Sequence, residues 1–200
     1  PTLSGILNRN LGSGASLRIY TGKSFLGNAT VKGRSWSFTP KTNLPTNRTY
    51  WFRARVADAA GNLGRLSNTR RLILDTARPA IRSSITRVSD NVGIKRGRVV
   101  NGARTDDRTP TLEGTLDSTL SAGGTLGIYS GDDFLGNATV DGKTWSFTPS
   151  RKLASNFTHS FTARVADAAG NLGAASNPRR LTIDTARPAI RSSITRVSDN

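Results

Sequence analysis

Acidic and amide side chains recur in short groups along the chain, and oxygen atoms of this kind could bind a hard cation. The groups are Asp75, Asp90-Asn91, Asp106-Asp107, Asp167 with Asn171, and Asp184. Ca²⁺ takes six to eight oxygen ligands, several of them from carboxylates. The same residue types also form turns without a metal, because their side chains hydrogen-bond to the nearby backbone. The residues therefore leave two interpretations open, a Ca²⁺ site and ordinary turns.

Groups that could catalyse a reaction are few. The chain has no Cys and one His, which excludes disulfides, thiolate metal sites and cysteine nucleophiles. His159 and the pair Asp132-Asp133 have no counterpart in an earlier, nearly identical stretch, where Tyr50 and Lys23-Ser24 stand in their places. Catalytic carboxylates need a cleft and shifted pKa values, and a turn between strands supplies neither. We therefore predict a protein that is not an enzyme and has no cofactor other than structural Ca²⁺.

The elements that position these groups are repeated, because the chain matches itself at an offset of 109 residues. Of the 91 aligned positions, 61 are identical, and the alignment has no insertion. Residues 36–40, Trp-Ser-Phe-Thr-Pro, recur for example as residues 145–149. A repeat of this length is a whole domain and not one turn of a solenoid.

Domain boundaries are expected near Thr76 and Thr185, where a strand-like run ends shortly before a proline. Residues 77–185 then form one complete module, and residues 1–76 form a module that lacks its first strand. Residues 186–200 repeat residues 77–91 and are the first strand of a following module. The first and last residues of the sequence fit a segment taken from a longer chain of repeated modules. They also fit strand complementation, in which residues 186–200 of another copy complete residues 1–76.

Apolar and polar residues alternate with a period of two in short runs, for example at Trp145 and Phe147 or at Phe161, Ala163 and Val165. Gly, Asn, Asp and Pro separate the runs, and no helical apolar stripe is present. The predicted strands of the complete module lie at about residues 80–88, 110–116, 123–130, 133–140, 143–148, 158–166 and 178–184. This pattern predicts an all-β chain of tandem immunoglobulin-like β-sandwiches, packed without disulfides.

Three motifs resemble the bacterial Ig-like repeats of large, secreted surface adhesins and biofilm-associated proteins. The first motif is Val88-Ser89-Asp90-Asn91-Val92-Gly93, followed by Thr105-Asp106-Asp107 and Thr109-Pro110-Thr111-Leu112. The second is Gly136-Asn137-Ala138-Thr139-Val140, followed by Trp145-Ser146-Phe147-Thr148-Pro149. The third is Ala166-Asp167-Ala168-Ala169-Gly170-Asn171, followed by Asp184-Thr185-Ala186-Arg187-Pro188. The resemblance implies an extracellular, cell-surface spacer that holds an adhesive tip away from the cell. Its partners are neighbouring modules of the same chain or fibre. It also implies that Ca²⁺ stiffens the module junctions.

The sandwich topology itself groups the acidic residues at module junctions. Asp90-Asn91 and Asp106-Asp107 belong to the connection after the first strand, which lies at the same end as Asp184, where the last strand leaves. By the same logic Asp75 of the first module faces Asp167 and Asn171 of the second. Basic side chains near the junction, at Arg78, Arg82 and Arg87, argue against a cation there.

Positive charge is concentrated in the first half of the chain. The net charge is +16, of which residues 1–91 carry +12 and residues 110–200 only +1. Arg18, Arg53 and Arg55 form a predicted basic stripe that would attract anionic polysaccharide, lipopolysaccharide phosphates or extracellular DNA. The alternative is a solvated face that only keeps the repeat soluble. No basic helix, zinc finger or stacking pattern indicates specific nucleic-acid binding, and no run of 18 apolar residues indicates membrane insertion.

Trp51 is the one tryptophan without a counterpart, because Ser160 takes its place in the second copy. It is either an exposed contact residue or an aromatic residue of an edge strand, and the sequence favours the edge strand. The prediction is a structural spacer repeat of a bacterial surface adhesin or filament. The alternative is an adhesive module that binds carbohydrate or polyanions through its basic face.

Overall fold

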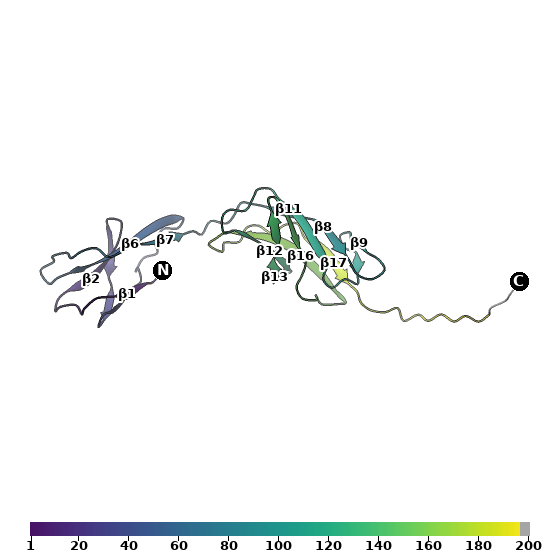
Figure 1. Ribbon diagram of the computed structural model, residues 1–200, viewed down its shortest axis with the longest axis horizontal. Coiled ribbons are helices and arrows are strands. Elements are labelled where there is room, and N and C mark those ends of the chain that lie inside the picture. The colour runs from purple at the N-terminus through teal and green to yellow at the C-terminus, as the bar shows by residue number, and fades with distance from the viewer. Residues whose placement is uncertain (197–200) are drawn as a thin grey trace. The chain divides into compact units, whose positions relative to one another are not determined.

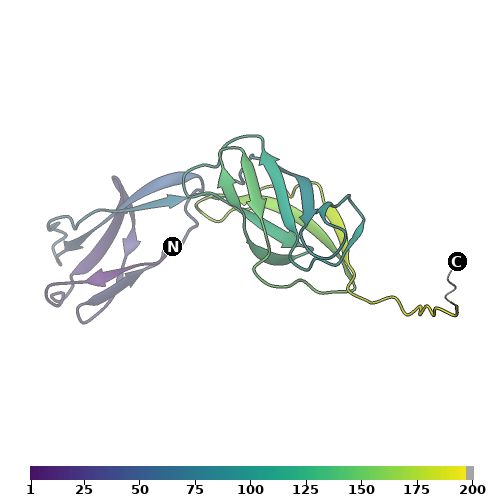
Figure 2. The same cartoon turned by 45° about the vertical axis from the view of Figure 1, so that its right-hand side comes forward.

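The computed structural model describes residues 1–196, and their regular structure consists of strands joined by turns (Figures 1 and 2). The chain divides into two compact units, Pro1–Ala77 and Arg78–Asn200. No helix is present among the described residues, so no helix there could cross a membrane. The predicted all-β fold of Ig-like sandwiches without disulfides is confirmed.

The second unit is a sandwich of two five-stranded sheets. The first sheet has the order β14 (Thr139–Asp141), β15 (Thr144–Phe147), β11 (Thr111–Leu116), β8 (Ser83–Asp90) and β9 (Gly97–Arg98). The second has the order β10 (Arg104–Thr105), β17 (Arg179–Ile183), β16 (Phe157–Ala166), β12 (Thr125–Ser130) and β13 (Asp133–Asn137). All pairs are antiparallel except β10 with β17.

One predicted strand is two strands in the structure. The expected strand at residues 133–140 divides at Ala138 into β13 and β14, which belong to different sheets. The backbone N–H of Ala138 donates to the carbonyl of Leu126 at 2.8 Å, so the chain stays bound where it crosses between the sheets. Strands β9 and β10 have two residues each, which is too short to produce an alternating pattern.

The core of the second unit joins side chains from both sheets. Leu112 comes from one sheet and Leu126, Ile128 and Phe161 from the other, and all four are fully buried. Trp145 is 3% exposed, and its indole N–H donates to the carbonyl of Thr115 at 3.3 Å. Burial of large aromatic and aliphatic side chains therefore holds the two sheets together without a disulfide.

The first unit has the same arrangement with fewer strands. One sheet has the order β1 (Leu3–Ile6), β5 (Ser35–Phe38) and β4 (Thr30–Lys32). The other has the order β3 (Ser24–Asn28), β2 (Ser16–Thr21), β6 (Arg48–Ala57) and β7 (Arg70–Leu74). Strand β1 corresponds to β11, and within residues 1–196 its partner strand is β5.

The shorter sheet leaves the core of the first unit more open. Its cluster of buried apolar residues contains Leu17, Ile19, Phe38 and Ala54. Trp36 is only half-buried, whereas the equivalent Trp145 is almost fully buried.

The described part of the segment expected to begin a following module has no neighbouring strand, and its place in such a module stays a prediction. Residues 186–196 have no regular structure, and residues 197–200 lie outside the described part of the chain. Residues 83–90, which have the same sequence as residues 192–199, form β8 because β11 and the core of their own unit lie beside them. A strand needs such partners to be stable.

Candidate functional site

A basic face covers the outer side of the β3-β2-β6-β7 sheet in the first unit. Along β2, Leu17 and Ile19 point into the core, so Arg18 between them points outward. Along β6, Phe52 and Ala54 are buried, which places Arg53 and Arg55 on the same outer side. The structure thus brings together the three arginines that the sequence grouped as a stripe.

Two of these arginines lie directly opposite each other on neighbouring strands. Arg18 and Arg55 are register partners of β2 and β6, and Tyr20 is the partner of Arg53. Like charges in directly opposite positions destabilise a sheet. Residues 1–77 hold 12 Lys and Arg but only two acidic residues, Asp58 and Asp75, so the unit cannot balance this charge internally.

Hydrogen bonds hold two of the guanidinium groups in place. Nε of Arg53 donates to the hydroxyl of Thr69 at 2.7 Å, and Nε of Arg55 donates to the carbonyl of Gly64 at 3.1 Å. A guanidinium has five N–H donors, so these bonds still leave donors for a ligand.

Aromatic side chains complete the basic face. Trp51 is 51% exposed, and the guanidinium of its register partner Arg71 lies 5.6 Å from the ring centre. Arg18 lies 5.7 Å from the ring centre of Phe25, which packs on Tyr20. The pairing of Trp51 with Arg71 was missed, although the register of a β6–β7 hairpin could have indicated it.

The position of Trp51 corrects the interpretation favoured from the sequence. Strand β6 lies between β2 and β7, so Trp51 belongs to an interior strand of its sheet and not to an edge strand. Its side chain is exposed because it is on the outer side of the sheet.

The second unit has the same fold as the first but lacks most of the side chains that form the basic face. Gly127, Ser160 and Thr162 stand at the positions of Arg18, Trp51 and Arg53. The aromatic pair is retained, with the rings of Tyr129 and Phe134 5.4 Å apart. The fold therefore does not require the three substituted side chains, and the second unit provides an internal reference for them.

Two of the candidate metal-ligating acids are buried in the second unit. Asp107 is fully buried and accepts hydrogen bonds from the backbone N–H groups of Thr109, at 2.7 Å, and Asn91, at 3.2 Å. Asp90 is 5% exposed and accepts from the hydroxyl of Thr105 and from a backbone N–H. Both carboxylates thus brace the loop that follows β8.

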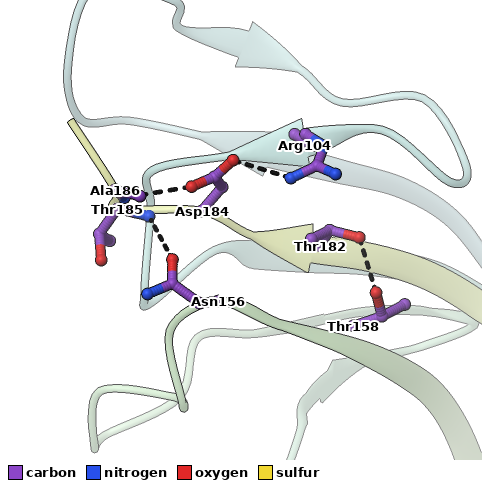
Figure 3. A network of polar contacts seen from close by, with 7 residues as sticks. All are labelled: Arg104, Asn156, Thr158, Thr182, Asp184, Thr185 and Ala186. Carbon is purple, nitrogen blue, oxygen red and sulfur yellow. Dashed lines mark hydrogen bonds and ion pairs between the residues drawn. The ribbon is translucent and has the colours of Figure 1, made fainter. Parts of the chain in front are cut away.

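Asp184 lies at the same end of the unit, as the sequence argument expected. Its backbone N–H donates to the carbonyl of Thr105 at 2.8 Å. Its carboxylate accepts from the backbone N–H of Ala186 at 3.1 Å and from the guanidinium of Arg104 at 2.8 Å (Figure 3). The Ala186 bond and the Arg104 charge lower the pKa of Asp184.

The remaining candidate ligands lie in turns. Asp106 is exposed and its carboxylate lies against Gly93, where an added Cβ would collide with it. The side-chain amide of Asn171 donates to Asp167 at 2.9 Å, and this bond and three backbone N–H groups lower the pKa of Asp167. Asp75 belongs to the first unit and accepts from the N–H of Ala77 at 2.9 Å.

Within residues 1–196, no three His, Asp or Glu side chains lie close enough together to hold a metal ion. Ca²⁺ at the module junctions stays a prediction.

His159 is bound into the wall of the second unit. It is 6% exposed, its Nε2–H donates to the carbonyl of Ala154 at 3.0 Å, and its Nδ1 accepts from the hydroxyl of Ser130 at 2.9 Å. The ring stacks on Phe161, with centres 5.7 Å apart. Both ring nitrogens are therefore bonded to partners within the second unit.

Comparisons with known proteins give one family match, and it lies in the second unit. Residues 88–185 match the family model of the bacterial Ig-like domain. A search of curated proteins finds no match. Among solved structures, one similar chain is SGBP-B of the mixed-linkage glucan utilization locus of Bacteroides ovatus, in complex with a mixed-linkage heptasaccharide. It is 12% identical with a TM-score of 0.26, and the alignment covers 90% of this chain but only 40% of that one. A likeness this low carries no argument about function.

Proposed function

We propose that this chain is a spacer of tandem Ig-like repeats in a bacterial cell-surface adhesin or extracellular filament. The observation that supports the proposal is the path of the chain through the second unit. The chain enters β8 at Ser83 and leaves β17 after Ile183. Thr105 bonds both to Asp90, at the far end of β8, and to Asp184, so entry and exit lie at opposite ends of the sandwich.

This path makes each repeat add length. Eight residues of β8 extend about 25 Å at the usual rise of a strand. Repeats connected end to end therefore lengthen a chain in proportion to their number. A polymer of this kind needs no catalytic cleft.

The spacer role is tested by changing the number of repeats. We expect the 200-residue chain with one inserted copy of residues 77–185 to gain at least about 25 Å in maximum dimension by small-angle X-ray scattering. A chain that folds the extra copy, as judged by circular dichroism, but gains no length would contradict the spacer role.

A second function, binding of an anionic polysaccharide or lipopolysaccharide, is supported by the basic face of the first unit. Arg18 and Arg55 form an opposed pair on the same sheet as the exposed Trp51, and such a pair is an unfavourable surface unless an anion neutralises its charge. Sugar rings pack on aromatic faces, and guanidinium groups form paired hydrogen bonds with carboxylate, sulfate or phosphate groups.

The binding function is tested with immobilised heparin and with alginate. The variant Arg18→Gly with Arg53→Thr gives the first unit the residues of the second, and we expect it to bind more weakly and with a smaller dependence on salt. The control variant Lys32→Ser with Arg34→Ser removes the same charge from the β1-β5-β4 side of the unit. An equal loss of heparin and alginate affinity in the two variants would show that binding depends on net charge and not on the basic face.

A further inference from the structure

Each unit has a lateral edge made by two consecutive strands. In the first unit β3 and β4 are outermost strands of their sheets, since β3 pairs with β2 and β4 pairs with β5. In the second unit β13 and β14 take the same places beside β12 and β15. A single residue joins the two strands in each unit, so each pair forms one continuous border of its sandwich. The edge is present in both units and is therefore a property of the module.

The two edges have the same sequence in the middle and different charges at the ends. Residues 25–31 are identical to residues 134–140. The residues that flank this stretch are Lys23, Ser24 and Lys32 in the first unit and Asp132, Asp133 and Asp141 in the second. We call the two surfaces the lysine edge and the aspartate edge.

A reversal of charge occurs only at these edges. Residues 1–77 hold 12 basic residues, and the second unit replaces six of them by uncharged residues and keeps a basic residue at four. The two that become acidic are Lys23 and Lys32. A general excess of positive charge in the first unit would account for the six lost charges. It would not account for two reversals of sign on the same edge.

The charges of both edges are available to a partner. The two lysines and three aspartates are exposed. Within residues 1–196, neither of the two ion pairs involves a residue of either edge. Lys143 is close to Asp141 in the sequence, but its ammonium group donates to the backbone carbonyl of Asp117 at 2.9 Å. No ion pair within the described chain therefore neutralises the edges.

An exposed aromatic side chain lies between the charged positions of each edge. Phe25 is 52% exposed and Phe134 is 56% exposed. Each ring packs on a tyrosine of the next strand, with ring centres 5.5 Å apart at Tyr20 and 5.4 Å apart at Tyr129. Protein interfaces combine an apolar centre with a polar rim. Both edges have this composition.

We propose that the lysine edge of the first unit binds the aspartate edge of the second unit in another copy of this chain. Nine positions separate Lys23 from Lys32 and Asp132 from Asp141, so basic ends meet acidic ends in either direction of alignment. Contact between two lysine edges or two aspartate edges would bring like charges together. The charges therefore select the partner edge by attraction to one and repulsion from the other.

The contact is made by side chains. The pairing of β13 with β12 shifts register between Ile128 and Tyr129, and the pairing of β3 with β2 shifts between Ile19 and Tyr20. Irregularities of this kind twist an edge away from the regular backbone pairing that would extend a sheet. Opposite charges and the two phenyl rings supply the attraction. The association should therefore weaken as salt is added.

Two variants with reversed charges test the proposal by sedimentation velocity. Lys23→Asp with Lys32→Asp makes both edges acidic, and Asp132→Lys with Asp133→Lys and Asp141→Lys makes both edges basic. The average mass of the unchanged chain should rise with concentration. Each variant alone should need about tenfold more protein for the same rise, because its edges repel each other.

An equimolar mixture of the two variants should recover the association, because an acidic edge again meets a basic edge. Both variants remain net positive, so attraction between their net charges cannot produce this result. Recovery also shows that both variants are folded at the edge. A strictly monomeric unchanged chain, or a mixture that stays monomeric, would overturn the proposal.

The control variant is Arg9→Asp with Arg65→Asp, in the segments that follow β1 and β6. It changes the net charge as much as Lys23→Asp with Lys32→Asp does, and it should associate like the unchanged chain. An equal loss of association in the two variants would show that net charge, and not the edge, controls association.

The copy that supplies the partner edge is identified by carbodiimide cross-linking of a mixture of unlabelled and ¹⁵N-labelled chains. We expect cross-linked peptides that join Lys23 or Lys32 of one isotope to Asp132, Asp133 or Asp141 of the other. If every such peptide has both halves from the same isotope, the contact lies within one chain and the assignment to a second copy is wrong.

Discussion

Trp51 and Arg71 lie opposite each other on β6 and β7, and the guanidinium of Arg71 is 5.6 Å from the centre of the indole ring. Arg71 has a counterpart, Arg180, in the second unit, but Trp51 is replaced there by Ser160. The aromatic–cation pair is therefore a property of the first unit alone.

Trp51→Ser should weaken heparin binding and leave the stability of the first unit nearly unchanged. The side chain is half exposed, so its loss from the outer side removes a ligand contact and little core packing. Affinity chromatography and thermal unfolding measure the two effects. Ile6→Ser is the matched comparison, since Ile6 is 75% exposed and lies on the other sheet of the unit. A fall in stability with unchanged affinity would assign Trp51 to folding.

Arg18→Thr should raise the free energy of unfolding of the first unit by up to about 1 kcal/mol at low ionic strength. The substitution removes the repulsion between Arg18 and Arg55. Salt screens exposed charges, so the gain should shrink as salt is added. Hydrogen exchange of the amides in residues 1–77 reports this unit separately. Arg34→Thr, in the turn between β4 and β5, should show no such gain.

Asp107→Ala should destabilise the second unit by about 1–3 kcal/mol, because it removes a fully buried carboxylate that accepts from the backbone N–H groups of Asn91 and Thr109. Asp106→Ala is the natural control, since Asp106 is adjacent and exposed. Urea unfolding of the full chain measures both variants. Similar losses for the two would mean that charge, and not the buried hydrogen bonds, stabilises this loop.

Acid should weaken the second unit at two places. The pKa values of Asp167 and Asp184 lie below the ordinary value of 3.8 in the folded chain, because hydrogen bonds favour the carboxylate form. Their stabilising contribution is present above pH 3.8 and is lost as the pH falls through the lower folded values. Thermal unfolding between pH 2 and 6 should show this loss, and Asp184→Asn should make the curve less steep.

The predicted Ca²⁺ at the junctions has a measurable consequence. An ion that binds only the folded chain raises the unfolding midpoint in proportion to the logarithm of its concentration. We expect Ca²⁺ to raise the midpoint, a chelator to reverse the rise, and Asp184→Asn to reduce it. If neither Ca²⁺ nor the chelator changes the unfolding midpoint, the prediction is wrong. Asp90, Asp107 and Asp184 then act through their hydrogen bonds only.

The sequence was sufficient to predict the fold, because it shows both the 109-residue repeat and the alternation of apolar and polar residues along the strands. Trp145 and Phe147 alternate with polar residues, and the structure buries both. Short elements such as β10 were not predictable, since two residues carry no period. Their pairing depends on β17, which is far away in the sequence.

Local sequence alone does not decide strand formation where tertiary contacts are needed. Residues 83–90 form a strand, whereas the described part of the identical segment 192–199 does not. At the basic face, the residue types suggested Arg18, Arg53 and Arg55, but only the strand order shows that Trp51 is interior to its sheet and faces Arg71.

The opposite placement of entry and exit in the second unit decides how it would respond to tension. A pull on the two ends is directed along β8 and β17, while their hydrogen bonds to β11, β16 and β10 run across the pull. The pulling force acts at right angles to these hydrogen bonds. Many of them must therefore break at the same time, because the strands cannot separate one bond after another. The module is thereby built to resist stretching along its own axis.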